Sequence, residues 1–553
     1  MSTSNASPQT EATGDGRLRR DMGLTSLLFT SVGSIIGSGW LFGAMYASQD
    51  AGPASVISWS LGGFMILLIG LVYAELGSMF PVSGGVVRFP HYSFGSFASY
   101  TTGWITWLAA ASVAPIEVEA ALQYATNYIP WLTQHVDGTA VLTVRGYGVA
   151  TALMLLFSFV NVVGVKWFAR INNIIVAWKL FIIMLVIVVF LAVEFQPEHF
   201  TMQGFAPMGA HGALSAIATA GIVFSFLGFR QAVEMAGETK NPHRNIPIAI
   251  IGSVVLTVLI YVGLQVAFIG SLPTSALANG WAGLHFENSF GPLAGVATIL
   301  GLTWLATLLY VDAFISPADT GLIYTTITAR ISYAMGKNGN APASLAKVSK
   351  KGVPWVSVAV TFFAGLVFFL PFPGWQQLVG FITSASVLSF GSGPLVLIAM
   401  RKQLPEQKRP FRLWGGIVLP FLAFWSSNLI VYWSGWATTW KLFAAILIGL
   451  VLLAIHEVAH KGKTPKLDMR SGFWVIPWLL GLCVISYLGN FPEVSEGAGN
   501  LGLIGFYLSF VVTGVFSGLI FWLAVAFQLS PERVHEHINE EWADEGDAPL
   551  GGH

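Results

Sequence analysis

The stretch Ala218–Ile250, ATAGIVFSFLGFRQAVEMAGETKNPHRNIPIAI, contains the feature that decides the fold. An apolar, helix-like run reaches Gly228, and Arg230 and Glu234 follow before the hydrophobic character ends. A charged side chain at the centre of a membrane helix costs about 2.5–3.5 kcal/mol, so it should have a partner or a substrate. The stretch therefore predicts a membrane helix that carries part of a functional site.

The composition indicates that the whole chain is a membrane protein. Hydrophobic residues make up 54% of the 553 residues and charged residues only 10%, whereas a soluble domain carries about 25% charged residues. The net charge is zero and no basic tract is visible, so we expect no nucleic-acid partner. The single cysteine, Cys483, excludes an intramolecular disulfide and a cysteine-based zinc site. No catalytic, metal or cofactor motif is present, so we expect neither an enzyme nor a cofactor.

The apolar runs predict about fourteen spans, because a helix needs roughly 20 mostly apolar residues to cross a bilayer. The eighth run is long enough to be one helix with a lead-in segment or two spans. Counting it once keeps the basic loops that follow it on the same side as the others. The expected spans are residues 24–46, 54–79, 97–127, 147–164, 171–194, 213–236, 247–270, 296–334, 354–371, 376–400, 414–434, 439–456, 472–489 and 501–526.

The distribution of Lys and Arg predicts the orientation of the chain. With the N-terminus inside, nearly all basic residues fall in cytoplasmic segments, as the positive-inside rule requires. Only Arg145 and Lys441 fall outside, while Lys179 and Arg230 lie within spans. We therefore expect both termini in the cytoplasm. The C-terminal tail is polar and acidic, and we expect it to be disordered.

The first expected span contains TSVGSIIGSGWLFG, with Gly37-Ser38-Gly39 in its middle. Two interpretations stay open. Gly33 and Gly37 form a GxxxG face for close helix packing, or the chain unwinds here and its free backbone groups face a cavity. The sixth span repeats the pattern in the run from Phe224 to Arg230. Interrupted spans at corresponding positions of two halves indicate a secondary-transporter site, where half-helix N-termini suit a carboxylate and free carbonyls an ammonium. Such a site suits an amino acid.

Five stretches in order over roughly residues 20–412 resemble the amino acid–polyamine–organocation (APC) superfamily, which shares the inverted-repeat fold of the sodium-coupled leucine transporter. The resemblance extends to bacterial aspartate/glutamate:proton symporters of that superfamily, some of which have extra C-terminal spans. It implies an all-α integral membrane protein with an inverted five-helix repeat, a leucine-transporter-like fold, and about 14 transmembrane helices. The matching stretches are Gly33–Gly43 (GSIIGSGWLFG), Ala74–Gly95 (AELGSMFPVSGGVVRFPHYSFG), Asn161–Leu180 (NVVGVKWFARINNIIVAWKL), Phe224–Ile250 and Ser316–Gly339 (SPADTGLIYTTITARISYAMGKNG).

This resemblance also implies a division of the chain into a transporter core with flanking segments. The core is expected to hold ten helices in two inverted repeats, and four further helices follow it. The expected segments are a cytoplasmic tail (1–23), the core (24–412, with repeats at about 24–194 and 213–400), the four added helices (413–527) and a second cytoplasmic tail (528–553).

The family pattern implies a substrate site made largely of backbone groups. The substrate α-carboxylate is expected at the amides around Ser38 and Gly39, and the α-ammonium at carbonyls of the first and sixth spans. Phe224 matches an aromatic gate above the substrate in related antiporters. With the basic residue discussed below, the expected substrate-binding residues are Ile35, Gly37, Ser38, Gly39, Phe224, Ser225, Leu227 and Arg230.

Proton coupling is expected at Lys179, which matches a fifth-span lysine that stands, in proton-coupled relatives, where sodium-coupled ones hold a sodium ion. Its ammonium should touch first-span carbonyls and Ser316 of the eighth span. The alternative is a lysine that snorkels to the interface. Glu117 and Glu119 are also candidates for carrying a proton, and because they are two residues apart on a helix they point to different faces. A structural pair with Arg230 is the alternative for either acid.

Two departures from the family pattern concern the substrate. Val86-Val87-Arg88-Phe89 stands where a Tyr-x-Tyr pattern is usual, and Arg230 stands where the family usually has an acid. A guanidinium offers a fork for a carboxylate, which favours a substrate with an anionic side chain. An internal ion pair with Glu234, or with an acid of the third span, is the alternative.

These observations together predict proton-coupled import of aspartate or glutamate across a bacterial inner membrane. The expected partners are the amino acid, protons, the lipid bilayer and possibly a second copy in a homodimer. The alternative is an amino-acid exchanger or a neutral amino-acid permease in which Arg230 forms a structural ion pair.

Overall fold

The computed structural model describes residues 22–82, 84–136, 139–163, 165–286, 291–337, 339, 341–349, 353–372, 374–460, 464, 466–491 and 500–544. Residues 1–21 and 545–553, which belong to the expected tails, lie outside this part. In the described residues the regular elements are helices apart from one antiparallel hairpin, in which Thr133 pairs with Leu142 and Val136 with Thr139. The elements are α1 (Leu24–Ile35), α2 (Gly39–Ala51), η1 (Gly52–Ala54), α3 (Ser55–Met79), α4 (Gly85–Phe94), α5 (Ser96–Ala111), α6 (Val113–Ala125), β1 (Thr133–Val136), β2 (Thr139–Leu142), α7 (Val144–Val163), α8 (Val165–Val193), η2 (Pro197–Phe200), α9 (Gly209–Thr219), η3 (Phe224–Arg230), α10 (Gln231–Glu234), η4 (Ala236–Glu238), α11 (Pro242–Gly270), η5 (Thr274–Leu277), α12 (Pro292–Ile299), α13 (Thr303–Lys337), η6 (Ala343–Ala346), α14 (Trp355–Phe368), α15 (Trp375–Gln403), α16 (Val418–Trp433), α17 (Trp436–Ala459), α18 (Met469–Gly472), α19 (Val475–Leu488), α20 (Phe506–Phe527) and α21 (Pro531–Asp544).

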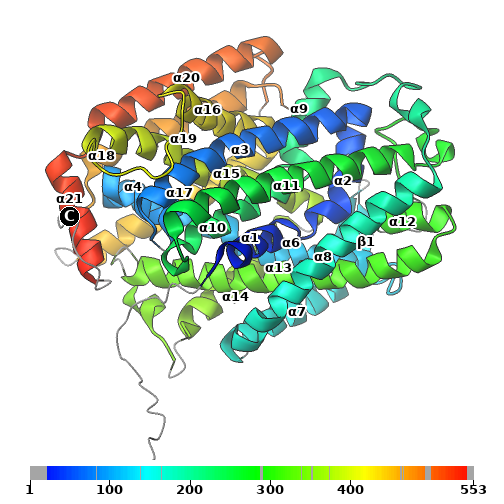
Figure 1. Ribbon diagram of the computed structural model, residues 1–553, viewed down its shortest axis with the longest axis horizontal. Helices are drawn as coiled ribbons and strands as arrows, with labels where there is room; N and C mark the ends of the chain where they lie inside the picture. The colour runs from blue at the N-terminus through cyan, green and yellow to red at the C-terminus, as the bar shows by residue number, and fades with distance from the viewer. Residues whose placement is uncertain are drawn as a thin grey trace, which may run out of the picture.

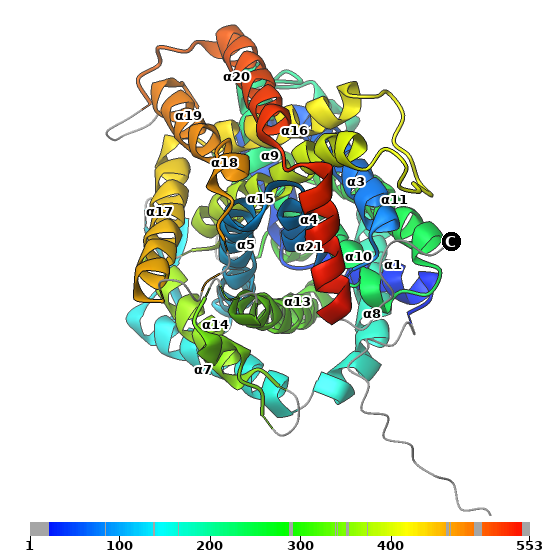
Figure 2. The same ribbon diagram turned by 90° about the vertical axis from the view of Figure 1, so that its left-hand side faces the viewer.

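The long helices run lengthwise through the molecule, as Figure 1 shows for α3, α8, α11 and α13. Viewed end-on in Figure 2, α4, α5, α10 and α13 surround the centre, and α7, α14, α17, α19 and α20 form the rim. The most apolar parts of Ser96–Ala125 and Trp375–Gln403 are completely buried, whereas only about a quarter of the residues in the corresponding parts of α7 and α17 are buried. The inner helices therefore meet other helices on all sides, and the rim helices present apolar side chains outward, as expected of lipid-facing spans.

The membrane-crossing segments agree with the predicted count of about fourteen. Among the described residues, nine helical segments are long and apolar enough to cross a membrane, and one bent pair, α9 with η3 and α10, makes a tenth. One of the nine segments contains both α2 and α3. Because the shorter apolar helix α1 precedes α2, this region contains two spans: α1 with α2, and α3. The short α14 and α16 and the long α13 complete the set. The eighth region is a single 35-residue helix, α13, with the short α12 leading into it.

Two spans are interrupted in the middle. The first is helical to Ile35 and again from Gly39, and the sixth bends by 46° between Thr219 and Phe224. The seven residues of η3 form a 3₁₀-helix, although runs longer than three or four residues are uncommon. The structure thus supports the unwound interpretation of the Gly37-Ser38-Gly39 stretch. Gly33, in turn, packs closely against Val176 of α8.

The two interrupted spans touch each other through their backbones. A Cβ atom on Gly228 would overlap backbone atoms of Ser34 and Ile35. Only glycine allows η3 to cross the end of α1 at this separation, because every other residue carries that carbon. Gly228 therefore fixes how closely the two interrupted spans approach each other.

The C-terminal segment is a helix, so the prediction that it is disordered is wrong for residues 531–544. Val534 and Ile538 are one turn apart in α21 and fully buried. The helix lies at the end of the bundle next to α4 (Figure 2), and the His537 ring stacks on that of His91 with centroids 4.5 Å apart. The acidic composition of the tail concealed these two apolar residues, which lie on the same side of the helix because they are four positions apart.

The contact between α21 and α4 should weaken in acid. Burial, His537, Arg533 and Arg88 lower the pKa of His91 to about 4, from an ordinary value near 6.5. The undocked imidazole therefore takes up a proton at higher pH than the docked one, so docking is favoured above about pH 6.5 and is lost as the pH falls toward 4. Hydrogen–deuterium exchange of residues 531–544 should accelerate between pH 7 and pH 5 beyond the intrinsic change. His91→Phe keeps a ring for stacking and should remove most of this dependence; an unchanged dependence in that variant would contradict the assignment.

Candidate functional site

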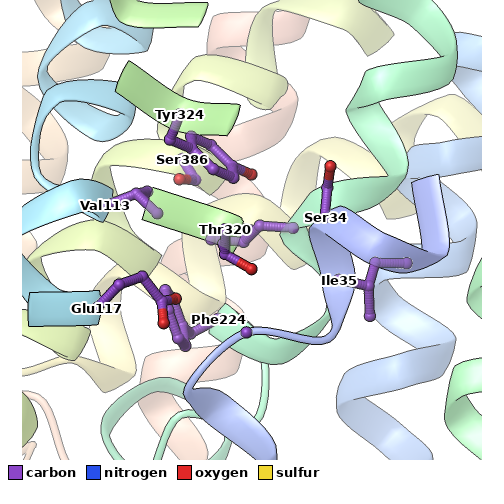
Figure 3. A pocket seen from close by; sticks show the side chains of 10 residues that line it. Ser34, Ile35, Val113, Glu117, Phe224, Thr320, Tyr324 and Ser386 are labelled. Carbon is purple, nitrogen blue, oxygen red and sulfur yellow. The ribbon is translucent and has the colours of Figure 1, made fainter. Parts of the chain in front are cut away.

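A small cavity lies where the two interrupted spans meet α6, α13 and α15. The cavity has a volume of about 10 Å³, which is about enough for one water molecule. In Figure 3, Tyr324 and Ser386 lie at one end of the group and Glu117 and Phe224 at the other. The lining residues are Ser34, Ile35, Gly37, Val113, Glu117, Phe224, Leu227, Thr320, Tyr324 and Ser386.

Glu117 holds the backbone amide at the start of α2. Its Oε2 accepts a hydrogen bond of 2.9 Å from the backbone N–H of Ser38. The first N–H groups of a helix have no acceptor within the helix and carry partial positive charge, which suits an anion. The second oxygen of Glu117, Oε1, is buried and has no hydrogen-bond partner. A side-chain carboxyl group of the protein thus lies where the α-carboxylate of a substrate is expected.

Lys179 of α8 is completely buried and joins three helices. Its Nζ lies 2.6 Å from Oδ2 of Asp319, and it donates to the carbonyl of Gly33 at 3.0 Å and to Oγ1 of Thr320 at 3.2 Å. The expected contact with a first-span carbonyl is therefore present. Complete burial excludes the snorkelling alternative.

The expected contact between Lys179 and Ser316 is absent from the described contacts. The Ser316 hydroxyl instead donates to Asp312 at 2.8 Å, and Trp178 Nε1 donates to the same carboxylate. The helix α13 continues without interruption through Pro317, so residues 316 and 320 lie one turn apart on one face. The lysine reaches the later turn.

Aromatic rings close the cavity beside Phe224. The ring of Phe224 meets Trp375, the first residue of α15, edge to face with centroids 6.1 Å apart. Trp375 stacks on Tyr46 at 5.5 Å and lies 4.9 Å from Phe42, and its Nε1 donates to the Ser38 hydroxyl at 2.8 Å. This cluster ties α15 to the interrupted first span, and the gate role of Phe224 stays a prediction.

Arg230 does not line the cavity. Its guanidinium lies over the ring of Tyr324, 5.2 Å from the centroid, and the side chain is 2% exposed. No carboxylate lies within 4.0 Å of it among the described residues, so the ion pairs proposed with Glu234, Glu117 or Glu119 are not formed there. Glu119 is also buried away from the cavity and neither of its oxygens has a hydrogen-bond partner.

The other predicted residues surround the first break. The Ile35 carbonyl already accepts from Tyr261 Oη at 3.3 Å and from the N–H of Gly37 at 3.1 Å, and Leu227 lines the cavity. The Ser225 hydroxyl donates to the Gly221 carbonyl, and a Cβ atom on Gly39 would overlap it. The sequence interpretation missed several wall residues; a polar residue in mid-span was the only signal for Ser34, Thr320 and Ser386, and the apolar Val113 gave none. The missed residues are Ser34, Val113, Thr320, Tyr324, Ser386 and, in the aromatic cluster, Trp375.

Comparison with known proteins decides the class. The amino acid permease family model matches residues 26–469, most of the chain. The chain belongs to the amino acid permease family. The glutamate/serine transporter AimA of Bacillus subtilis is 39% identical to this permease over 513 residues, which are 92% of this chain and 93% of the relative. The aspartate-proton symporter of the same organism is 38% identical over 517 residues, 92% and 96% of the two chains. The branched-chain amino acid permease BcaP, also from Bacillus subtilis, is 27% identical over 458 residues.

The permease is therefore a multi-span membrane transporter of amino acids and not an enzyme. The predicted superfamily and the all-helical membrane fold are both confirmed.

Removal of one partner of the Lys179–Asp319 pair should destabilise the permease. Lys179→Met leaves a buried carboxylate without its cation, which should lower the free energy of unfolding by about 3–5 kcal/mol. The double variant Lys179→Met/Asp319→Leu removes both charges and should recover most of that loss. Thermal unfolding of purified protein in detergent measures the difference. Lys337→Met, at an exposed lysine of the same helix as Asp319, is the matched control, and an equal effect there would contradict the assignment.

Proposed function

We propose that this permease imports aspartate or glutamate together with protons, by alternating access across a bacterial inner membrane, with both termini in the cytoplasm. The two relatives at 38–39% identity, a glutamate/serine transporter and an aspartate-proton symporter, support the substrate class and the coupling ion. The observation that carries the proposal is the hydrogen bond between Glu117 and the Ser38 amide.

Glu117 links proton binding to substrate binding in this proposal. While its carboxylate accepts from Ser38, the N-terminus of α2 is occupied and unavailable to a substrate carboxylate. Protonation of Glu117 removes the charge that the helix end favours and weakens this hydrogen bond. The freed amides around Gly37, Ser38 and Gly39 then bind the substrate. The unpartnered Oε1 faces the cavity at Gly37 and is the atom open to the incoming proton.

In this proposal Lys179 links proton binding to the relative position of α1 and α13. Its ammonium holds α1 at the Gly33 carbonyl and α13 at Asp319 and Thr320. Loss of a proton from this group would release α1 from α13, which is the kind of relative motion that alternating access needs. In this scheme Ser316 orders the neighbouring Asp312, while Glu119 serves as a second protonatable group in α6.

Charge movement explains why coupling is needed. An aspartate anion entering against an inside-negative potential is opposed by about 2.3 kcal/mol per 100 mV. One accompanying proton cancels that opposition, and a second makes the potential a driving force. A protonatable residue at the substrate site, such as Glu117, allows the two species to enter together.

Reconstituted proteoliposomes test the proposal directly. Radiolabelled aspartate should accumulate only when the outside is more acidic than the inside, and a proton ionophore should abolish the accumulation. Glu117→Gln is neutral, like the protonated acid, and cannot take up a proton, so it should retain aspartate exchange and lose gradient-driven accumulation.

The same assay on Glu119→Gln distinguishes the two acids of α6. Replacement of the cavity-facing Glu117 should abolish the dependence of uptake on the proton gradient, whereas Glu119→Gln should keep it. Aspartate uptake that is indifferent to the gradient would instead favour an exchanger. Uptake of serine without aspartate or glutamate would favour a neutral permease, for which the absence of a cation from the described cavity walls is the supporting observation.

A further inference from the structure

Arg230 is a buried cation, and two of its three side-chain nitrogens have no hydrogen-bond partner. It is 2% exposed, and its Nε and Nη2 atoms have no hydrogen-bond partner. Among the described residues no carboxylate oxygen lies within 4.0 Å of it, and Glu234, one turn further along the chain, is beyond that distance. Buried charges in proteins are normally paired, because leaving one unpaired is costly. The Arg230 side chain therefore has the charge and the free hydrogen-bond donors needed to bind an anion.

Tyr324 separates this cation from the substrate cavity. One face of its ring carries the Arg230 guanidinium at 5.2 Å, and the same side chain forms part of the cavity wall. Figure 3 shows Tyr324 at the end of the cavity away from Glu117 and Phe224. A cation over an aromatic face is stabilised, but the ring accepts no hydrogen bonds from the two free N–H groups. A carboxylate can accept both at once.

The position of Arg230 in the sixth span indicates on which side of the cavity it lies. Phe224 lies beside the aromatic cluster at one end of the cavity, and Arg230 follows it by six residues at the far end of η3. Beyond Arg230, the Glu234 carbonyl accepts from the N–H of Gly84 at the start of α4, and Met22, just before α1, pairs with Thr239. In the proposed orientation, with the N-terminus inside, Arg230 lies on the cytoplasmic side of the cavity.

We propose that Arg230 and Tyr324 form a second carboxylate site, on the cytoplasmic side of the substrate cavity, in which Tyr324 is a gate and Arg230 binds the side-chain carboxylate of an acidic amino acid on its way out. This proposal rests on the proposed function, because the side chain of a neutral amino acid has no carboxylate for the guanidinium to bind. Rotation of the Tyr324 ring opens the cavity toward Arg230, and the substrate carboxylate replaces the ring as the partner of the guanidinium.

Removal of the Tyr324 ring should change the binding of acidic substrates much more than the binding of neutral ones. Tyr324→Ala exposes Arg230 to the cavity, so binding of glutamate and aspartate should tighten by about 10-fold, the order of one added charged hydrogen bond, while their turnover falls because release is slower. Serine binding should change by less than about 2-fold. Tyr324→Phe keeps the ring over the guanidinium and is the matched control, in which the binding of glutamate and aspartate should not tighten.

Arg230→Gln removes the cation and should weaken glutamate and aspartate binding by about 10-fold or more, with serine unchanged. In the double variant Tyr324→Ala/Arg230→Gln, the tighter binding seen with Tyr324→Ala should disappear. Scintillation-proximity binding of radiolabelled glutamate, aspartate and serine to purified protein measures all of these, and thermal unfolding identifies misfolded variants. If Tyr324→Ala does not fold, Tyr324→Leu fills more of the space and tests the same opening.

The outcomes separate the two proposals. If the unmodified permease binds serine but neither acidic amino acid, the proposed function fails. If it binds acidic amino acids, but the Tyr324 and Arg230 variants change serine and glutamate binding by the same factor, Arg230 is structural and the second site is wrong. A loss of selectivity for acids in Arg230→Gln alone, without any gain in Tyr324→Ala, overturns the gate.

Discussion

The structure depends on satisfying backbone groups that are left free in the middle of a membrane. Between Ile35 and Gly39 the chain leaves its helix, and no water of the bilayer core is available to pair its amides. The protein supplies the partners itself. The Ile35 carbonyl accepts from Tyr261, the Ser38 amide donates to Glu117, and the Ser38 side chain accepts from Trp375. Because these partners come from α11, α6 and α15, the break holds distant parts of the core together.

The same contacts describe a closed conformation. The aromatic cluster of Phe224, Trp375, Phe42 and Tyr46 covers one end of the cavity, and Tyr324 covers the other. The remaining space is too small for an amino acid, so binding requires the walls to separate. The aromatic contacts at the two ends of the cavity involve the interrupted spans, α13 and the first residue of α15. These are the elements whose relative movement would open a path on one side at a time.

Buried charges in the core are arranged in two different ways. Lys179 and Asp319 form a pair at 2.6 Å with further hydrogen bonds around the ammonium, which is how a buried ion pair offsets the cost of its desolvation. Arg230 has an aromatic face and no carboxylate within reach among the described residues. The first arrangement is complete without a ligand, whereas the second leaves hydrogen-bonding capacity unused. This contrast suggests structural coupling for the lysine and ligand contact for the arginine.

The sequence by itself determined the class of the protein and its spans, and it marked the two places where a span could be interrupted. Apolar run length and the shortage of charge are local properties, and the glycines at Gly37 and Gly39 mark a poor helix wherever they fold. Only the tertiary structure decided which group meets which. It placed Glu117 on the Ser38 amide, Asp319 rather than Ser316 beside Lys179, and Tyr324 between Arg230 and the cavity. It also placed the C-terminal helix on α4. These pairings depend on the rotation and crossing of helices far apart in the chain, which a residue pattern along one helix does not encode.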